Sequence, residues 1–182
     1  MDAGVRALGI AAFGEQARIL DEACSAYSEE RELILRYLLS LDAPLADAQE
    51  LTQEVFLAYY AALLGGAGIS VRRAWLFAVA SRKFLNWRKS QSRRATLAID
   101  NDAAQSVADS AQTPEARLLA LEKDRAVHDA IQSLSTQQRI CLHLRGEGLH
   151  YREIADVLGI SVPAVAEFLR RAIVRIRKVV HA

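Results

Sequence analysis

The chain of 182 residues has few of the residue types that build disulfide scaffolds, fibrous repeats or tightly turning backbones. It contains two cysteines, three prolines and nine glycines. Two thiols, Cys24 and Cys141, cannot form a disulfide framework, which favours a reducing compartment. The low proline and glycine content excludes a fibrous chain, and a hydrophobic fraction of 52% excludes a disordered one. The composition predicts one globular domain of ordinary size or two small ones.

Long hydrophobic segments are also missing. The longest apolar stretch, residues 58–69, contains three glycines and is too short to span a bilayer. Arg6, Glu15 and Arg18 stand where a signal peptide would need an unbroken apolar region. We therefore expect a cytoplasmic protein without membrane insertion.

The net charge of +1 conceals a strong segregation of charge. Residues 72–94 carry eight basic side chains and no acidic one, and residues 168–182 carry five more, again without an acidic one. The rest of the chain consequently carries −12. This pattern favours two surfaces for a polyanion, although two solvated helix faces would give the same distribution.

The hydrophobic periodicity predicts helices throughout. Apolar residues repeat at helical spacing in residues 15–64 and 71–92, and Pro44 stands where a helix would begin. The glycines of residues 65–68 mark a helix end. No segment alternates in the manner of a β-strand, so we predict an all-α protein.

A change of composition separates two parts of the chain. Residues 95–114 are small, polar and acidic, which is typical of a flexible linker. A further helix is predicted from Glu115 to about Ser133. We expect two small helical domains, residues 1–94 and 115–182, joined by this acidic linker.

The most specific local pattern lies near the C-terminus. Ala155 is small where two helices must approach closely, Gly159 favours a turn with positive φ, and Val165 is an inward anchor of the next helix. Ser161 is a candidate N-cap of that helix. The spacing is that of a helix-turn-helix, whose second helix usually enters the major groove of DNA, and the alternative is a plain helical hairpin.

The first basic segment also contains aromatic rings: Trp75, Phe77, Phe84 and Trp87. Exposed rings would stack on unpaired bases while the cations hold the backbone. Alternatively the rings belong to the core, which helical spacing favours for Trp75 and Phe77. Trp87 is predicted to be the exposed ring.

Together these patterns resemble the extracytoplasmic-function (ECF) sigma factors of the sigma-70 family. Residues 47–57, Asp-Ala-Gln-Glu-Leu-Thr-Gln-Glu-Val-Phe-Leu, are similar to the family's polymerase-binding helix, usually written D-A-E-D-L-V-Q-E-x-F. Residues 74–80 resemble the aromatic segment that takes part in promoter opening. Residues 82–94 resemble the basic helix that reads the −10 element, and residues 134–148 with the following helix-turn-helix resemble the domain that reads the −35 element.

The resemblance covers residues 15–94 and 115–180 and implies three groups of contact residues. The residues expected to bind core RNA polymerase are Asp47, Glu50, Leu51, Gln53, Glu54 and Phe56. The residues expected to bind the melted −10 DNA are Arg72, Arg73, Trp75, Arg82, Lys83, Asn86, Trp87, Arg88 and Lys89. The residues expected at the double-stranded −35 DNA are Tyr151, Arg152, Ser161, Pro163, Ala164, Glu167, Arg170 and Arg171. Leu51 and Phe56 fit either the polymerase interface or the domain core.

The sequence departs from the family pattern at the second helix of the helix-turn-helix. The family often has Lys-Ser-Arg after the valine that matches Val165, whereas residues 166–168 here are Ala-Glu-Phe. Losing two cations and gaining an anion predicts weaker and less salt-dependent binding. Three interpretations stay open: a divergent −35 sequence with Glu167 accepting from a cytosine amine, a tilted helix that relies on Arg170 and Arg171, or weak dependence on the −35 element.

Nothing in the sequence favours catalysis or a cofactor. The histidines and cysteines have no zinc spacing, and the glycines form no phosphate-binding loop. The resemblance therefore implies a non-enzymatic alternative sigma factor, with an anti-sigma factor as a candidate further partner. Two other hypotheses remain: a helix-turn-helix regulator that acts without core polymerase, and a sigma-like decoy that binds an anti-sigma factor but no DNA.

Overall fold

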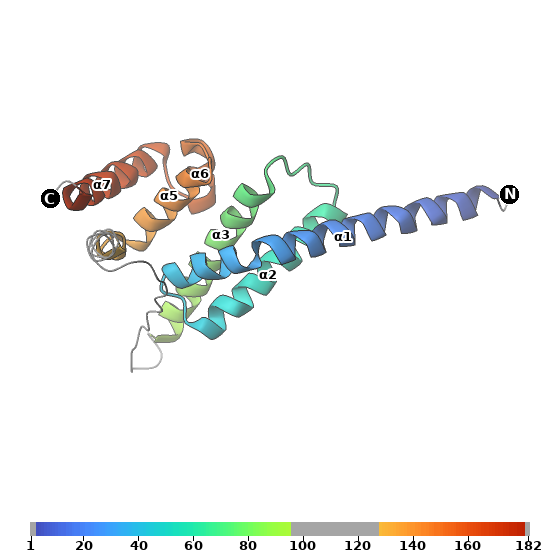
Figure 1. Ribbon diagram of the computed structural model, residues 1–182, viewed down its shortest axis with the longest axis horizontal. Helices are drawn as coiled ribbons and strands as arrows, with labels where there is room; N and C mark the ends of the chain where they lie inside the picture. Colours follow the sequence, from blue (N-terminus) through green and yellow to red (C-terminus); the bar gives the residue numbers. More distant parts are fainter. Residues whose placement is uncertain (1–2, 96–127, 181–182) are drawn as a thin grey trace, which may run out of the picture. The chain divides into compact units, whose positions relative to one another are not determined.

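The computed structural model describes residues 3–95 and 128–180, which contain α-helices and no strand, as the all-α prediction requires (Figure 1). The chain divides into two compact units, Met1–Lys89 and Ser90–Ala182. The predicted acidic linker, apart from Ala95, lies outside the described residues, as does the start of the helix predicted at Glu115.

The first unit contains α1 (Ala3–Ser40), α2 (Leu45–Leu64) and most of α3 (Arg72–Ala95), whose last residues, 90–95, fall in the second unit. Helix α1 begins at Ala3 rather than at the predicted residue 15, and in Figure 1 it continues beyond the ends of α2 and α3. Glycine in a helix interior costs only about 1 kcal/mol relative to alanine, so the glycines near the N-terminus do not end the helix. The prediction at Pro44 is confirmed, since its carbonyl accepts from the Ala48 N–H at 2.8 Å.

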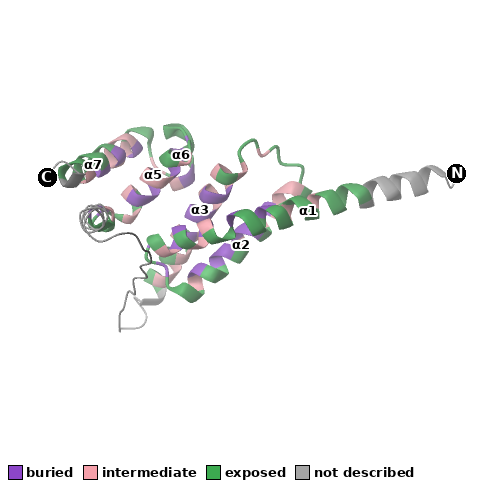
Figure 2. Cartoon of the chain, in the orientation of Figure 1, coloured by how far each residue is buried: buried purple, intermediate pink, exposed green. Residues whose placement is uncertain are grey.

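Contacts between the helices define how the first unit packs. Helices α1 and α2 run antiparallel, with the Tyr59 hydroxyl donating to Glu22 at 3.0 Å. Helix α3 meets α1 through a buried hydrogen bond between the Tyr37 and Ser81 hydroxyls at 2.6 Å. Buried apolar side chains of all three helices form the core (Figure 2). Its largest members are Tyr59, Phe77, Phe84, Ile34, Leu38, Leu41, Leu76 and Val55.

The second unit contains helical residues 128–132, followed by α5 (Thr136–Gly146), α6 (Tyr151–Leu158) and α7 (Val162–Val180). Helix α5 begins with a capping box: the Ser135 hydroxyl accepts from the Gln138 N–H at 3.3 Å, and the Gln138 side chain accepts from the Ser135 N–H at 3.0 Å. The three helices pack on one another around a small apolar core. This core contains Ile140, Leu144, Ile154, Val165, Leu169 and Ala172.

The turn between α6 and α7 has the predicted helix-turn-helix form. Gly159 ends α6 with φ 65°, in the left-handed region that favours glycine. Ala155 and Val165 are buried between the helices, as their spacing predicts. The Ser161 hydroxyl accepts from the Ala164 N–H at 3.4 Å and so caps the start of α7. Helix α7 therefore packs one face on the core of the second unit and exposes the opposite face to solvent.

Candidate polymerase and nucleic-acid interfaces

Helix α2 carries an exposed stripe that faces away from the core. Glu50 and Gln53 are exposed, and the same face continues one and three turns later with Leu57 and Leu64. Leu57 and Leu64 are 67% and 47% exposed. Sequence reasoning gave Leu57 no role, although its spacing from Glu50 and Gln53 is the signal that would have found it.

The other two acidic side chains of α2 lie on its flank toward α3. The Trp87 indole Nε1–H donates to Asp47 Oδ1 at 2.9 Å, and Lys83 Nζ donates to Glu54 Oε2 at 2.7 Å. All four residues are half-buried. We call these two contacts the α2–α3 bridges. They bring residues predicted to bind polymerase against residues predicted to bind DNA.

The structure decides the question that the sequence left open for the two apolar residues of the α2 motif. Leu51 and Phe56 are buried, with 5% and 7% of their surfaces exposed. The Phe56 ring packs edge-on against Tyr27 of α1, with centroids 5.0 Å apart. Both residues belong to the core of the first unit.

The aromatic rings of α3 are less exposed than the sequence predicts. Trp87, predicted to be the exposed ring, is half-buried, because its indole is bonded to Asp47 and its ring lies 5.6 Å from that of buried Phe84. Phe77 is buried, as its spacing favours. Trp75 is half-buried against the Tyr59 ring of α2 at 5.5 Å. The main role of these three rings is therefore to pack α3 against the rest of the first unit.

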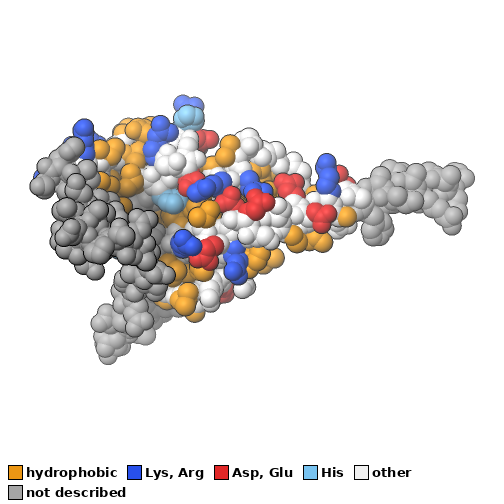
Figure 3. Space-filling model, viewed as in Figure 1, with side chains coloured by type: hydrophobic (Ala, Val, Ile, Leu, Met, Phe, Trp, Pro, Cys, Tyr) orange, Lys and Arg blue, Asp and Glu red, His pale blue; other side chains and the backbone are white. Residues whose placement is uncertain are grey.

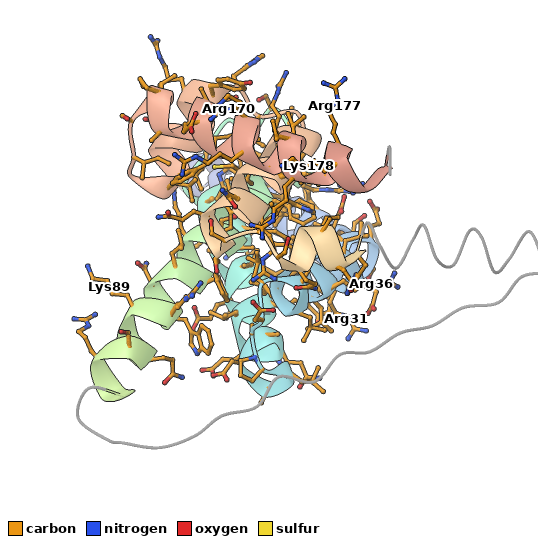
Figure 4. The ribbon with its side chains drawn as sticks, turned by 90° about the vertical axis from the view of Figure 1, so that its left-hand side faces the viewer. Arg31, Arg36, Lys89, Arg170, Arg177 and Lys178 are labelled. Carbon is orange, nitrogen blue, oxygen red and sulfur yellow. The ribbon has the colours of Figure 1, made fainter. Side chains whose placement is uncertain are left out.

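The outer face of α3 is a polar and basic stripe. Arg82, Asn86, Lys89 and Arg93 are exposed and follow one another at spacings of one helical turn. Figure 4 shows Lys89 projecting outward from α3. Arg88 is exposed on a different side of the helix. We call the four residues the α3 stripe.

The two arginines that open α3 differ in their surroundings. Arg72 forms an ion pair with Glu29 and lies 3.8 Å from Glu30, so its charge is balanced by α1. Hydrogen bonds from Ser25 and Arg72 lower the pKa of Glu29 below its usual value. Arg73 is exposed, with its guanidinium 5.8 Å from the centroid of the Phe77 ring. Figure 3 shows basic and acidic side chains interspersed over this part of the surface.

In the second unit, the predicted residues gather at the start of α6 and on α7. Tyr151 and Arg152 are exposed at the start of α6, and the Arg145 guanidinium lies 5.8 Å from the centroid of the Tyr151 ring. Ser161 and Pro163 are exposed at the start of α7, and Ala164 beside them is half-buried.

The Glu167 carboxylate offsets part of the positive charge on the middle of α7. Glu167 accepts from Arg170 through Nε and Nη2, each at 2.8 Å, and from Arg171 Nε at 2.6 Å. The hydrogen bonds from Arg170 and then Arg171 lower the pKa of Glu167 to about 2, so the carboxylate is ionised throughout the neutral range. The three side chains together carry one net positive charge. Figure 4 shows Arg170, Arg177 and Lys178 along this helix.

Within residues 3–95 and 128–180, no group of three His, Cys, Asp or Glu side chains could hold a metal ion. Burial raises the pKa of the Cys141 thiol to about 12, which makes it unreactive at neutral pH. Among the described helices, none combines the length and the hydropathy that spanning a bilayer requires.

Comparison with known sequences identifies the family. Residues 124–176 match the family described as Sigma-70, region 4. RNA polymerase sigma factor YlaC of Bacillus subtilis is 29% identical over 153 residues, which cover 84% of this chain and 88% of the relative. The ECF RNA polymerase sigma-E factor of Haemophilus influenzae is 30% identical over 148 residues, which cover 77% of this chain and 75% of the relative. The chain belongs to the ECF family of RNA polymerase sigma factors.

Solved structures share the fold of this ECF sigma factor. The sigma factor RpoE of Bartonella quintana, in a complex with the anti-sigma factor NepR, matches with a TM-score of 0.65 at 17% identity, over 87% of this chain and 96% of that one. CnrH, in a complex with the cytosolic domain of CnrY, matches with a TM-score of 0.53 at 20% identity, over 92% of this chain and 95% of that one. The all-α architecture predicted from the sequence is therefore that of known sigma factors.

Proposed function

We propose that this ECF sigma factor binds core RNA polymerase and directs it to promoter DNA, which both of its units contact. The observation that carries the proposal is the 30% identity to the Haemophilus influenzae sigma-E factor over 148 residues. That alignment is longer than either structural unit, so the resemblance includes both. The protein would supply sequence specificity, and the polymerase would supply catalysis.

The outward stripe of α2 is the best candidate for docking on the polymerase. It combines the acidic Glu50 and the amide of Gln53 with the exposed side chains of Leu57 and Leu64. Exposed apolar side chains bordered by polar ones are typical of a protein interface. Because Leu51 and Phe56 are in the core, their contribution to docking would be to hold α2 in shape.

The α3 stripe is the best candidate for the −10 contact. Arg82, Lys89 and Arg93 would neutralise phosphates, while Asn86 is placed between them to bond a base edge. A melted strand exposes base faces and edges that a duplex hides, so the solvent-accessible parts of the half-buried Trp75 and Trp87 rings would stack on bases. Arg72, which is paired to α1, would contribute less to this contact than Arg73.

Helix α7 is the best candidate for reading the −35 element. In a helix-turn-helix the first residues of the second helix lie at base edges, which here are Ser161, Pro163 and Ala164. Tyr151 and Arg152, at the start of α6, would contact the backbone. Arg170 and Arg171 would reach phosphates only by sharing their bonds with Glu167.

An anti-sigma factor is a further candidate partner. The relative from Bartonella quintana was solved in a complex with such a protein. The faces of α2, α3 and α7 proposed here to bind polymerase and DNA are exposed in this chain, and a partner covering them would block both activities.

Selection from a random duplex library tests the proposed function against its alternatives. The protein with bacterial core polymerase should retain a subset of duplexes, and neither component alone should do so. Retention by the protein alone would indicate the helix-turn-helix regulator. Retention by neither the protein nor the mixture would indicate the decoy.

A further inference from the structure

The α2–α3 bridges join the helix proposed to dock on polymerase to the helix proposed to read DNA. On α2, Asp47 and Glu54 are two turns apart, and on α3 they meet Trp87 and Lys83, which are one turn apart. The order of the contacts reverses between the two helices, so α3 runs antiparallel to α2. Two contacts at different heights fix both the position of α3 along α2 and its rotation.

These contacts fall on the part of α3 that carries the DNA-facing residues. Lys83 directly follows Arg82, and Trp87 directly follows Asn86, so each bridge immobilises the turn from which one residue of the α3 stripe projects. The Trp87 ring also packs on buried Phe84. On the side of α1, the hydrogen bond between Tyr37 and Ser81 holds α3 two residues before Lys83.

The bridges also divide the polar residues of the α2 motif into two kinds. Asp47 and Glu54 have acceptor oxygens engaged by α3, whereas Glu50 and Gln53 lie on the outward face. A polymerase surface that took Asp47 and Glu54 as its main contacts would have to compete with Trp87 and Lys83. A surface that meets the outward face would leave both bridges intact.

We propose that Asp47 and Glu54 are positioning residues, which aim the α3 stripe at the melted DNA strand, and that polymerase docks on the outward stripe of α2 instead. This inference rests on the proposed function and assigns separate roles to neighbouring acidic residues. One helix thus binds the polymerase with one face and orients the DNA-binding helix with its flank.

The first test needs only the isolated chain. In a Trp75→Phe background, Trp87 is the only tryptophan, so its fluorescence reports the bridge directly. Asp47→Ala should shift its emission to longer wavelength and raise its quenching by acrylamide, because the indole loses its partner. Asp47→Asn should behave as the parent, since the amide oxygen still accepts from the indole. Equal quenching in all three proteins would overturn the proposal.

The second test separates positioning from docking in the holoenzyme. The probe is a fork-junction DNA whose single-stranded segment carries the sequence recovered from the random library. Asp47→Ala should weaken binding of the holoenzyme to this probe by about tenfold, the scale of losing one hydrogen bond to a charged group. Glu54→Ala should weaken it by a smaller factor, because the ion pair with Lys83 is partly exposed to solvent. Their affinity for core polymerase should not change, and Asp47→Asn should restore DNA binding.

Matched variants distinguish residues that position α3 from residues that dock on polymerase. Glu50→Ala with Gln53→Ala should weaken core binding and leave the Trp87 fluorescence unchanged. Combining Asp47→Ala with Trp87→Phe should weaken DNA binding no more than the stronger single change, because both remove the same bond. Loss of core binding by Asp47→Ala to the level of the Glu50 and Gln53 variant would overturn the proposal. Failure of the wild-type chain to bind core would instead contradict the proposed function, and the fluorescence would still decide whether Asp47 positions Trp87.

Discussion

Glu167 is the residue whose charge most alters what α7 can do. Its carboxylate accepts three hydrogen bonds from Arg170 and Arg171, the two arginines predicted to contact DNA. Exposed ion pairs of this kind contribute little to stability, so their main effect here is on the electric field at the helix surface. By partly cancelling two positive charges, Glu167 lowers the attraction of α7 for anions such as phosphates.

Replacing Glu167 by glutamine should therefore make duplex binding tighter and less selective. We expect the affinity of the holoenzyme for random duplex to rise roughly threefold to tenfold at low salt, and the dependence of log K on log salt concentration to steepen by about one unit. Fluorescence anisotropy across a salt series measures both quantities. Asp129→Asn, the same charge change at an exposed residue outside α7, is the control. An unchanged slope would mean that Arg170 and Arg171 already reach phosphates in the wild-type protein.

The residues that sequence reasoning placed incorrectly or left open share one physical cause. Helical spacing identifies the side of a helix, but the depth of a side chain depends on what packs beside it. Trp87 is half-buried because Asp47, forty residues earlier, supplies a hydrogen-bond partner. For the same reason, the sequence alone could not decide whether Leu51 lies in the core or at an interface. The sequence could have placed Leu57 on the same face as Glu50 and Gln53, because that face is set by local helical spacing alone.

Among the elements, the α6–α7 turn depends most clearly on one backbone conformation. Gly159 has φ 65°, and a Cβ atom there would meet no atom within 4 Å. Any loss of stability on substitution would therefore come from backbone strain rather than from a steric clash. Gly146, at the end of α5, has no positive φ and also has open space around it.

This contrast predicts opposite effects for two glycine-to-alanine changes. Gly159→Ala should lower the free energy of unfolding of the second unit by about 1 kcal/mol. Gly146→Ala should raise it by about 0.5 kcal/mol, because alanine favours the helix. Urea unfolding followed by far-UV circular dichroism measures both changes. The unfolding transition seen by tryptophan fluorescence should not move, since Trp75 and Trp87 both lie in the first unit. Equal effects of the two changes on the free energy of unfolding would contradict the claim that the positive φ of Gly159 requires glycine.

The α3 stripe yields a prediction about one helix face. Arg82→Glu with Lys89→Glu should abolish strand opening, because two phosphate-binding charges become repulsive, while core polymerase still binds. Permanganate footprinting detects opening, and co-elution detects core binding. Arg31→Glu with Arg36→Glu, an equal charge change at exposed residues of α1, should leave opening intact. Loss of both activities in the Arg82 and Lys89 variant would mean that this face binds polymerase.

Most of the elements were predictable because their signals are local. Hydrophobic spacing, Pro44 and Gly159 predicted α2, α3 and the helix-turn-helix close to their observed limits. The start of α1 was missed because nothing in the first residues stops a helix strongly enough. The capping box at Ser135 follows a pattern visible in the sequence, Ser-x-x-Gln, that sequence reasoning did not use.

At the scale of the whole molecule, the segments of opposite charge lie on separate helices. The basic residues 72–94 form α3, the acidic motif of residues 47–57 lies in α2, and the second basic segment lies in α7. The sequence could predict this organisation because it depends on which residues share an element. It could not predict that the flank of the acidic helix bonds to the basic one, since that contact arises only from the packing of α2 on α3.

Co-elution of the full chain with bacterial core RNA polymerase on size exclusion, in moderate salt, tests the central claim most directly. The wild-type protein should co-elute, and Glu50→Lys with Gln53→Lys should not, because the outward face of α2 would then carry cations. Gln16→Lys with Asp21→Lys, an equal charge change at exposed residues of α1, should still co-elute. Absence of co-elution by the wild-type chain, or its persistence in the Glu50 and Gln53 variant, would contradict the assignment of this face as the polymerase-docking surface of an ECF sigma factor.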